Sequence, residues 1–548
     1  MMKKKISHAV YDEKDLYPYL MRMNVLKGTG VDTNECGQKP IIAVVNSHTE
    51  MNTGHMHLAS LATRVKEGIH AAGGIPFEFN VPAPCDGLAE GNDGMKFILA
   101  QRDLIADMVE THVRSQLFDG MVMIASCDKI IPGMLMAAAR CSLPTIFLTG
   151  GPTLYEIRLR KGYKGTILHS DYEDLNDKLN TVYCASCGAC EIMGTANTFQ
   201  SLAEALGMTL PGTACIPAYH SERLRVARLT GKHIMKMVEE DVTADKILTK
   251  KALENALAVN MAVGGSTNAA LHLPALAHEL GVDMPLTLFN DFSKRIPTLC
   301  RLSPSGPHGI TDLYRAGGIP AVMKRLKEDL HLDALNVSGR TIGEIIESAV
   351  VSDEEVVPDR SAPYYPEGGT VVLTGNLAPE GAVIKQSAVV NDQHVFTGPA
   401  HVFESEHDFL AAIREGNINE GEVIVIRNEG PQGGPGMPEM LAATMSIGAH
   451  GYTRVALITD GRFSGATSGP CVGHVSPEAL AGGPIGILKD DDEITINIPE
   501  RSIDVKLSSG ELQKRIAAYT PIRREIPKGF MRRYVKQVGS AAKGAILE

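Results

Sequence analysis

The chain has 548 residues, 44% of them hydrophobic and 21% charged, so it is long enough to form more than one hydrophobic core. Its net charge of -11, with no long basic block, argues against a surface built to neutralise nucleic acid phosphates. No signal-peptide pattern and no run of about 18 apolar residues occurs, which predicts a cytoplasmic protein that does not enter membranes.

The strands and helices expected in the first part of the chain alternate. Apolar β-branched runs predict strands, and apolar residues at helical spacing predict the helices between them. This alternation predicts an N-terminal α/β domain with a parallel sheet, over residues 1–365. Its clearest expected elements are strands at residues 40–45, 118–124 and 144–148 and helices at residues 58–72 and 131–140.

From about residue 370 the chain changes to short strands separated by glycine-rich turns. We expect a second domain there, a β-rich and barrel-like α/β domain over residues 366–548. The polar, proline-containing residues 352–369 are the expected connector. The expected strands are residues 370–373, 422–426, 454–458 and 493–498.

Glycine-rich segments follow several of the expected strands, where α/β proteins place their sites. None has the spacing of a phosphate-binding loop or of the dinucleotide fingerprint, which disfavours a nucleotide-dependent enzyme. These segments are residues 150–152, 264–268, 430–436 and 461–469.

The ten cysteines are too sparse for a disulfide scaffold, and a cytoplasmic setting keeps thiols reduced. Packing or metal binding are the roles left to them. Cys141, Cys215 and Cys300 stand in ordinary contexts typical of small buried side chains. The cysteines with unusual neighbours are Cys85, Cys127, Cys184, Cys187 and Cys190.

Two of these thiols stand beside a carboxylate. Cys85 precedes Asp86, and Cys127 precedes Asp128 and Lys129 at an expected strand end. Thiolates suit iron and carboxylates suit magnesium, so two Cys-Asp pairs can serve two metals at once.

The three cysteines at positions 184, 187 and 190 have a spacing that fits either zinc or an iron-sulfur cluster. The spacing alone does not choose between them. A second cysteine pair, which a four-cysteine zinc ribbon needs, is absent, and this favours a cluster completed by a thiol from upstream.

These motifs resemble the dihydroxy-acid dehydratase and 6-phosphogluconate dehydratase family, over roughly residues 38–545. The resemblance implies a hydro-lyase that converts a 2,3-dihydroxy carboxylic acid to a 2-keto acid. It is carried by residues 127–140, 188–198, 264–268, 429–437 and 459–465.

The resemblance also implies two cofactors. An iron-sulfur cluster would be held by thiolates that include Cys127 and Cys190. A Mg²⁺ ion would be held by Asp86, Asp128, Glu429 and a carbamylated Lys129. Carbamylation matters because it turns an amine into an anionic oxygen ligand, which Mg²⁺ prefers.

The position of the third cysteine ligand differs from that in part of the family. Members with a [2Fe-2S] cluster carry it at the position of Gly54 here. Cys85 is the nearest replacement, which favours a [4Fe-4S] cluster on Cys85, Cys127 and Cys190, with [2Fe-2S] as the alternative. Cys187 is a possible substitute ligand, and Cys184 is expected to be a packing residue.

The resemblance assigns the general base to Ser464. A free serine is too weak an acid for this role unless nearby cations stabilise its alkoxide. We expect its hydroxyl in a water-excluded cleft between the domains, close to magnesium. His474 and His48 are the alternatives, since histidine is the commonest general base.

The stretch up to Gly37 departs from the family pattern, and two kinds of substrate fit the rest of the chain. The body of the chain, including residues 433–436, resembles the branched-chain amino acid enzymes more than the phosphogluconate branch. This resemblance implies dihydroxy-acid dehydratase of valine and isoleucine biosynthesis, with an aldonate dehydratase as the alternative. An iron-sulfur electron-transfer protein is the alternative from another class. The family suggests a homodimer or homotetramer that takes a small-molecule substrate.

Overall fold

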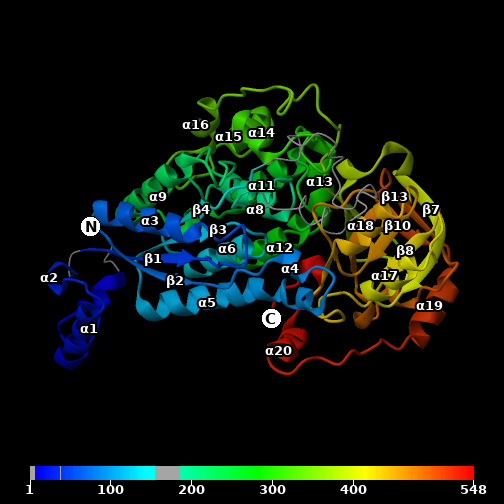
Figure 1. Ribbon diagram of the computed structural model, residues 1–548, viewed down its shortest axis with the longest axis horizontal. Coiled ribbons are helices and arrows are strands. Elements are labelled where there is room, and N and C mark those ends of the chain that lie inside the picture. Colours follow the sequence, from blue (N-terminus) through cyan, green and yellow to red (C-terminus); the bar gives the residue numbers. More distant parts are fainter. Residues whose placement is uncertain (1–5, 37–38, 155–185) are drawn as a thin grey trace, which may run out of the picture.

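The structure, a computed structural model, describes residues 6–36, 39–154 and 186–548, so Cys184 lies outside the described residues. Two β-sheets lie at opposite ends of an elongated molecule, with helices covering and joining them (Figure 1). The first sheet belongs to the N-terminal part of the chain and the second to the C-terminal part.

The first sheet has four parallel strands in the order β2-β1-β3-β4. The strands predicted in this region are confirmed to within two residues. The chain order changes direction between β1 and β3, and α/β proteins bind ligands at the carboxyl edge of such a point. The strands are β1 (Ile41–Asn46), β2 (Ile75–Asn80), β3 (Gly120–Ala125) and β4 (Thr145–Thr149).

Two pairs of helices cover this sheet, α3 and α9 on one face and α5 and α6 on the other. The α3 and α9 backbones approach closely at Gly68 and Gly231, where a Cβ on either would collide with the opposite helix. The predicted helices are confirmed as α3 and α6. The bounds are α3 (Leu58–Ala71), α5 (Ala100–Gln116), α6 (Ile130–Cys141) and α9 (Ser221–Glu239).

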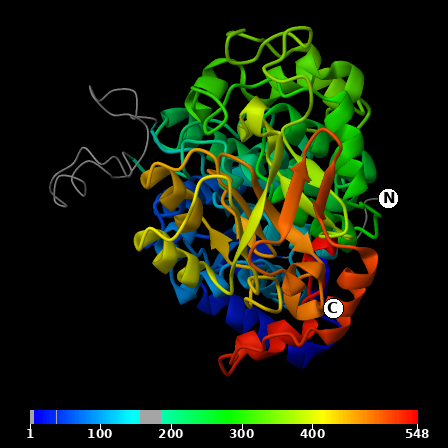
Figure 2. The same cartoon turned by 90° about the vertical axis from the view of Figure 1, so that its right-hand side faces the viewer.

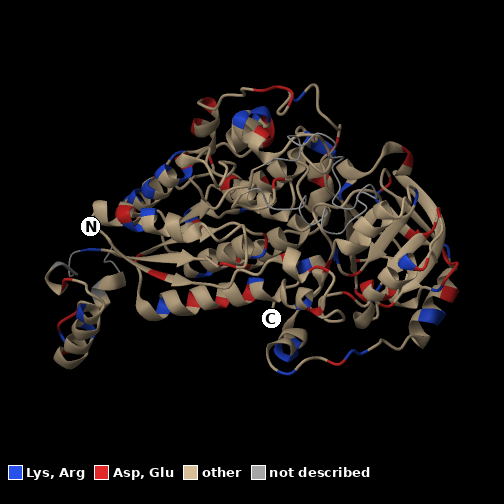
Figure 3. Ribbon diagram, viewed as in Figure 1, with Lys and Arg blue, Asp and Glu red and all other residues tan. Residues whose placement is uncertain are grey.

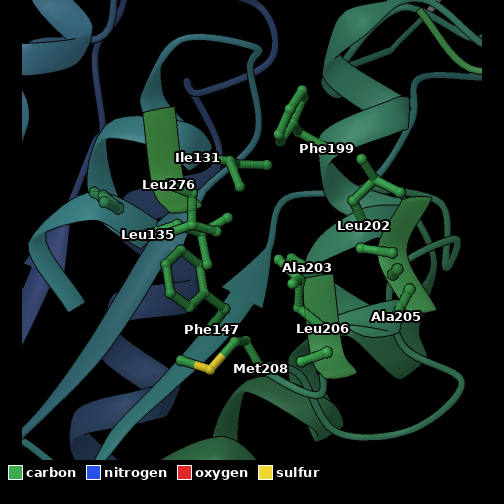
Figure 4. Packing of buried hydrophobic residues seen from close by; sticks show 14 of the residues in the cluster. Ile131, Leu135, Phe147, Phe199, Leu202, Ala203, Ala205, Leu206, Met208 and Leu276 are labelled. Carbon is green, nitrogen blue, oxygen red and sulfur yellow. The ribbon is translucent and has the colours of Figure 1, made fainter. Parts of the chain in front are cut away.

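A further group of helices packs beside β4 and α6. Phe147 of β4 lies among Leu135 of α6, Met208 and the apolar face of α8 (Figure 4). Cys215 and Cys300 are buried in the same core, as predicted, whereas Cys141 is half-buried. These helices are α8 (Thr195–Ala205), α10 (Ala244–Ile247), α11 (Lys250–Ala262), α12 (Ala269–Glu279), α13 (Thr287–Arg295), α14 (Ile310–Arg315), α15 (Gly318–Arg325) and α16 (Ile342–Glu347).

Short elements precede the sheet, join its strands or, in the case of η3, follow α15. The most exposed is α1, which extends from the body at the N-terminal end (Figure 1). These elements are η1 (Ile6–Ala9), α1 (Leu16–Gly28), α2 (Thr33–Cys36), α4 (Asp86–Ala89), η2 (Asp93–Phe97) and η3 (Lys327–Asp329).

The second sheet has eight strands and curls into a barrel-like form (Figure 2). Its two outer strands, β5 and β14, meet where Thr374 pairs with Ser502. One apolar cluster fills the inside, and a second lies under α17 and α18. The mixed α/β fold class is therefore confirmed. The elements are β5 (Val371–Leu373), β6 (Gly381–Ile384), β7 (Val395–Phe403), α17 (Glu406–Arg414), β8 (Val423–Ile426), α18 (Ala442–Ala449), β10 (Ala456–Thr459), β12 (Cys471–Ser476), β13 (Glu493–Asn497) and β14 (Ser502–Val505).

A separate two-stranded pair lies beside this sheet, and α19 and short 3-10 turns complete the C-terminal part. The paired strands are parallel, with Glu439 opposite Arg462. The elements are β9 (Glu439–Met440), β11 (Arg462–Phe463), η4 (Gln386–Ala388), η5 (Asn391–Gln393), η6 (Ala479–Ala481), η7 (Pro484–Ile487) and α19 (Ser509–Ala518).

The C-terminal segment returns to the first sheet. Its helix α20 (Phe530–Gln537) and turn η8 (Ala541–Lys543) pack against the starts of α5 and α12. Arg102, fully buried on α5, donates to the carbonyls of Gly544 and Ala545 at 2.8 Å and pairs with Asp103 at 3.0 Å. One guanidinium group therefore ties the C-terminal end of the chain to α5.

Replacing Arg102 with leucine is expected to destabilise the protein by about 3–5 kcal/mol, because a buried Asp103 would lose its cation. Thermal unfolding and proteolysis of residues 519–530 measure the loss. Arg64→Leu is the control, since its ion pair with Glu67 is exposed and worth about 0–1 kcal/mol. Equal stability of the two variants would contradict this role of Arg102.

Charged residues of both signs are mixed over the surface. Both signs occur along α5, for example, with basic residues near its two ends and acidic residues between them (Figure 3). Within the described ranges, no helix has the length and apolar character needed to cross a membrane.

Candidate active site

The predicted thiol ligands lie in loops at the carboxyl edge of the first sheet. Cys127 follows β3, and its N–H donates to Nε2 of His55 at 3.0 Å. His55 lies in the loop after β1, and its Nδ1 donates in turn to the Ser47 carbonyl at 2.7 Å. The loops after β1 and β3 are thus joined at the point where the strand order changes direction.

The loop that carries Cys190 reaches the same place. Gly188 donates its N–H to the Thr53 carbonyl at 2.9 Å. A Cβ on Gly54 would lie 2.8 Å from the Cys127 sulfur and 3.6 Å from the Cα of Ala189. The Asn197 side chain fixes the Cys190 loop by donating to the Cys190 carbonyl.

The thiols of Cys85, Cys127 and Cys190 lie close enough to influence one another's charge. Burial raises the pKa of Cys127 well above its usual value, and the charges of Asp128, Cys190, Asp86 and Cys85 raise it further. A thiolate at position 127 therefore requires a cation beside it, and a bound metal supplies one. These residues fit the predicted cluster.

Three carboxylates form a compact group beside the thiols. Oxygens of Asp86, Asp128 and Glu439 lie within 4.8 Å of one another. The Lys129 Nζ lies among them, 2.5 Å from Asp86, 2.5 Å from Asp128 and 3.0 Å from Glu439. Carboxylate oxygens are ligands that suit Mg²⁺, so this group fits the predicted magnesium site.

Burial and mutual repulsion shape the charges of this group. Burial, followed by the neighbouring Asp86, raises the pKa of Asp128. Burial and Arg462 would lower the pKa of Lys129, but the carboxylates outweigh them and raise it. Burial would raise the pKa of Glu439, yet Lys129 and Arg462 hold it below its usual value.

Glu439 is positioned by groups from several of the motifs. Its Oε2 accepts hydrogen bonds from Arg462 at 2.7 Å and from Asn268 at 3.1 Å. Asn268 also donates to the Thr195 hydroxyl at 2.9 Å, which bonds to Ser266 at 2.8 Å. Motifs far apart in sequence therefore converge on Glu439, a carboxylate that no sequence motif predicted.

The predicted ligand Glu429 is not in this group. Its carboxylate instead accepts from the Glu406 N–H at 3.3 Å and faces Arg524 at 3.5 Å. Its N–H is held by Asp460 at 2.8 Å. The glycine-rich turn of residues 430–437 then carries the chain to the first sheet, so the carboxylate after the turn, Glu439, reaches Lys129.

Ser464 directly follows β11, the strand paired with that of Glu439. The Ser464 turn packs against the start of α8, since a Cβ on Gly465 would lie 2.8 Å from the Cα of Gly194. Ser464 lines a narrow cavity with Thr267 and residues of β6 and β12. This arrangement combines residues from both halves of the chain.

Of the two alternative bases, His474 is unsuited to the role. His474 is buried, and burial, followed by Arg462, lowers its pKa to about 3, too low for a base at neutral pH. His48 is half-buried, and its backbone N–H bonds to Asn46 at 3.1 Å.

Comparison with known proteins identifies the class. The description "Dihydroxy-acid/6-phosphogluconate dehydratase" fits both halves of the chain, the N-terminal family model over residues 39–345 and the C-terminal one over residues 355–545. The chain belongs to this family. It is therefore an enzyme of the hydro-lyase type, as the sequence predicts.

Individual relatives cover nearly the whole chain. It is 50% identical to dihydroxy-acid dehydratase of Acetivibrio thermocellus, over 94% of this chain and 95% of that one. It is 48% identical to dihydroxy-acid dehydratase 1 of Methanosarcina acetivorans and 47% identical to the Halothermothrix orenii enzyme, each over 96% of this chain and 97% of the relative.

Proposed function

We propose that this enzyme is a dihydroxy-acid dehydratase of valine and isoleucine biosynthesis, which converts a 2,3-dihydroxy acid to a 2-keto acid. The names and high coverage of its relatives support this substrate over an aldonate. The observation that carries the proposal is the carboxylate group around Lys129, next to Cys127, with Ser464 two residues after Arg462, which bonds Glu439. An electron-transfer protein would have no use for the carboxylate group.

We propose an iron-sulfur cluster on Cys85, Cys127 and Cys190, [4Fe-4S] in preference to [2Fe-2S]. We also propose Mg²⁺ on Asp86, Asp128, a carbamylated Lys129 and Glu439, the last in place of Glu429. When bound, the two metals supply Lewis acidity toward the substrate hydroxyl and carboxylate oxygens.

The residues of the chain supply the remaining chemistry. Ser464 takes the proton from C2 as the C3 hydroxyl leaves, and the resulting enol becomes the keto acid. Arg462 and Asn268 hold Glu439 in place while negative charge develops on the substrate.

The domain bounds, the cellular location and the oligomeric state complete the proposal. The domains are residues 1–365, with the cluster ligands, and residues 366–548, with Ser464. The enzyme is cytoplasmic. It assembles as a homodimer or homotetramer.

The function is tested by anaerobic reconstitution with iron, sulfide and Mg²⁺, followed by a substrate screen. We expect 2-keto acid release from 2,3-dihydroxyisovalerate to exceed release from aldonates. Faster keto acid release from an aldonate would show that the enzyme is a sugar-acid dehydratase instead. Absence of keto acid from every dihydroxy acid would refute the proposal.

Serine substitutions test the cluster ligands. Cys127→Ser and Cys190→Ser are each expected to abolish the visible absorption of the cluster, and Cys85→Ser to damage it nearly as much. Cys184→Ser is expected to keep the colour. Iron content and absorption spectra measure both effects. If Cys184→Ser lost the visible absorption of the cluster and Cys85→Ser kept it, the third ligand would lie in the loop of residues 184–190.

A further inference from the structure

A buried lysine with no assigned role lies beside Ser464. Lys385 follows β6 and is 6% exposed. Its Nζ makes long hydrogen bonds, 3.4 Å to the Met193 carbonyl and 3.5 Å to the Gly465 carbonyl. In the described part of the chain no carboxylate lies within ion-pair distance of it.

Lys385 and Ser464 line the same cavity, together with Thr267, Val383, Phe463 and Thr467. The cavity holds about 10 Å³, room for about one water molecule. Lys385 is the charged residue of this lining, as far as the chain is described. A desolvated lysine without a counter-ion is poised to lose its proton or to stand beside an anion.

We propose that Lys385 is the proton-accepting partner of Ser464, and that the two form a serine-lysine pair that generates the alkoxide. The proposal rests on the role of Ser464 as the base. Serine requires an adjacent base or cation to act at neutral pH. The neutral lysine amine is the base that takes the serine proton, and the resulting ammonium ion is the cation beside the alkoxide.

The charge state of Lys385 agrees with this geometry. Burial lowers the pKa of Lys385 to about 7, so a large share of the amine is neutral at neutral pH. The other titratable group of the lining is Cys471, and burial raises the pKa of its thiol to about 12. The next residue, Gln386, accepts a hydrogen bond from Arg501, and Arg501 pairs with Glu367.

The proton movements balance. The Ser464 O–H proton passes to the Lys385 amine, giving an alkoxide and an ammonium ion. The alkoxide takes the C2 proton, the C–H electron pair forms the C2=C3 bond, and the C3–O bond breaks. The departing hydroxide receives the lysine proton through solvent and leaves as water. Ser464 and the neutral amine are then restored.

Lys385→Ala in the metal-loaded enzyme tests the pair. We expect turnover and C2-hydrogen exchange in D₂O to fall at least about 10²-fold. Methylamine should restore part of both rates. With wild type, kcat/KM should fall below about pH 7. In the rescued variant, the pH below which kcat/KM falls should be lower with 2-fluoroethylamine than with methylamine, because 2-fluoroethylamine is the weaker base. Lys506→Ala, which removes an exposed lysine, should behave as wild type.

Lys385→Met keeps the side-chain length without the amine and serves if Lys385→Ala does not fold. A slow Lys385→Met enzyme without the limb near pH 7 would support the pair. Wild-type turnover in either variant, or no response of folded, metal-loaded Lys385→Ala to amines, would overturn it. These results concern the pair alone, since failure of the proposed function would instead show as an inactive wild type.

Discussion

Ser464→Ala is expected to lower turnover by about 10²- to 10⁴-fold, the loss typical of removing a general base. The metals should be retained, because the Ser464 hydroxyl is not among the carboxylate and thiol groups that converge at the edge of the first sheet. Keto acid release, iron content and Mg²⁺ content measure the two parts of this expectation separately.

Exchange of the substrate C2 hydrogen with solvent should fall in parallel, since that step needs the same base. Ser468→Ala is the matched control, because Ser468 is an exposed serine in the same loop. If Ser464→Ala kept near-normal turnover with its metals intact, Ser464 would not be the base.

The elements of both sheets could be predicted because their periodicity is local. Residues 41–45 are apolar and buried, and Leu58, Leu61, Ala62 and Val65 repeat at helical spacing on the buried face of α3. Closure of the second sheet could not be read in this way. It depends on Thr374 meeting Ser502, a pairing between residues 128 positions apart that no local pattern encodes.

The residues of the candidate site also differ in whether a local sequence pattern predicts them. Asp86, Asp128 and Lys129 are adjacent to thiols in sequence, and the structure brings all three together. Glu439 has no such neighbour. The family resemblance implied Glu429, which follows an apolar strand, but a strand end fixes only where a turn begins. The path of the turn, held where Gly436 packs against the Lys96 carbonyl, decides which carboxylate arrives.

Lys385 shows another kind of omission. In sequence it is a single lysine after a short apolar strand, a pattern typical of a surface residue. Its burial depends on β11, β12 and the start of α8 closing over it, and only the assembled fold shows this.

Glu439→Gln is expected to weaken Mg²⁺ binding by more than the roughly 10–100-fold typical of losing a partner of a metal ligand. The amide keeps the shape of the side chain and can still accept from Arg462, so the fold should survive. It removes, however, one of the negative charges that surround Lys129. Competition between Mg²⁺ and Mn²⁺, followed by electron paramagnetic resonance, measures the affinity.

Glu429→Gln is the matched control for this prediction. It makes the same chemical change in a glutamate ten residues upstream, whose carboxylate faces Arg524 and the Glu406 N–H. We expect its Mg²⁺ affinity to equal that of wild type. Weak Mg²⁺ binding by Glu429→Gln with normal binding by Glu439→Gln would restore the ligand expected from the sequence. It would also require the glycine-rich turn to take a different path when the metal is bound.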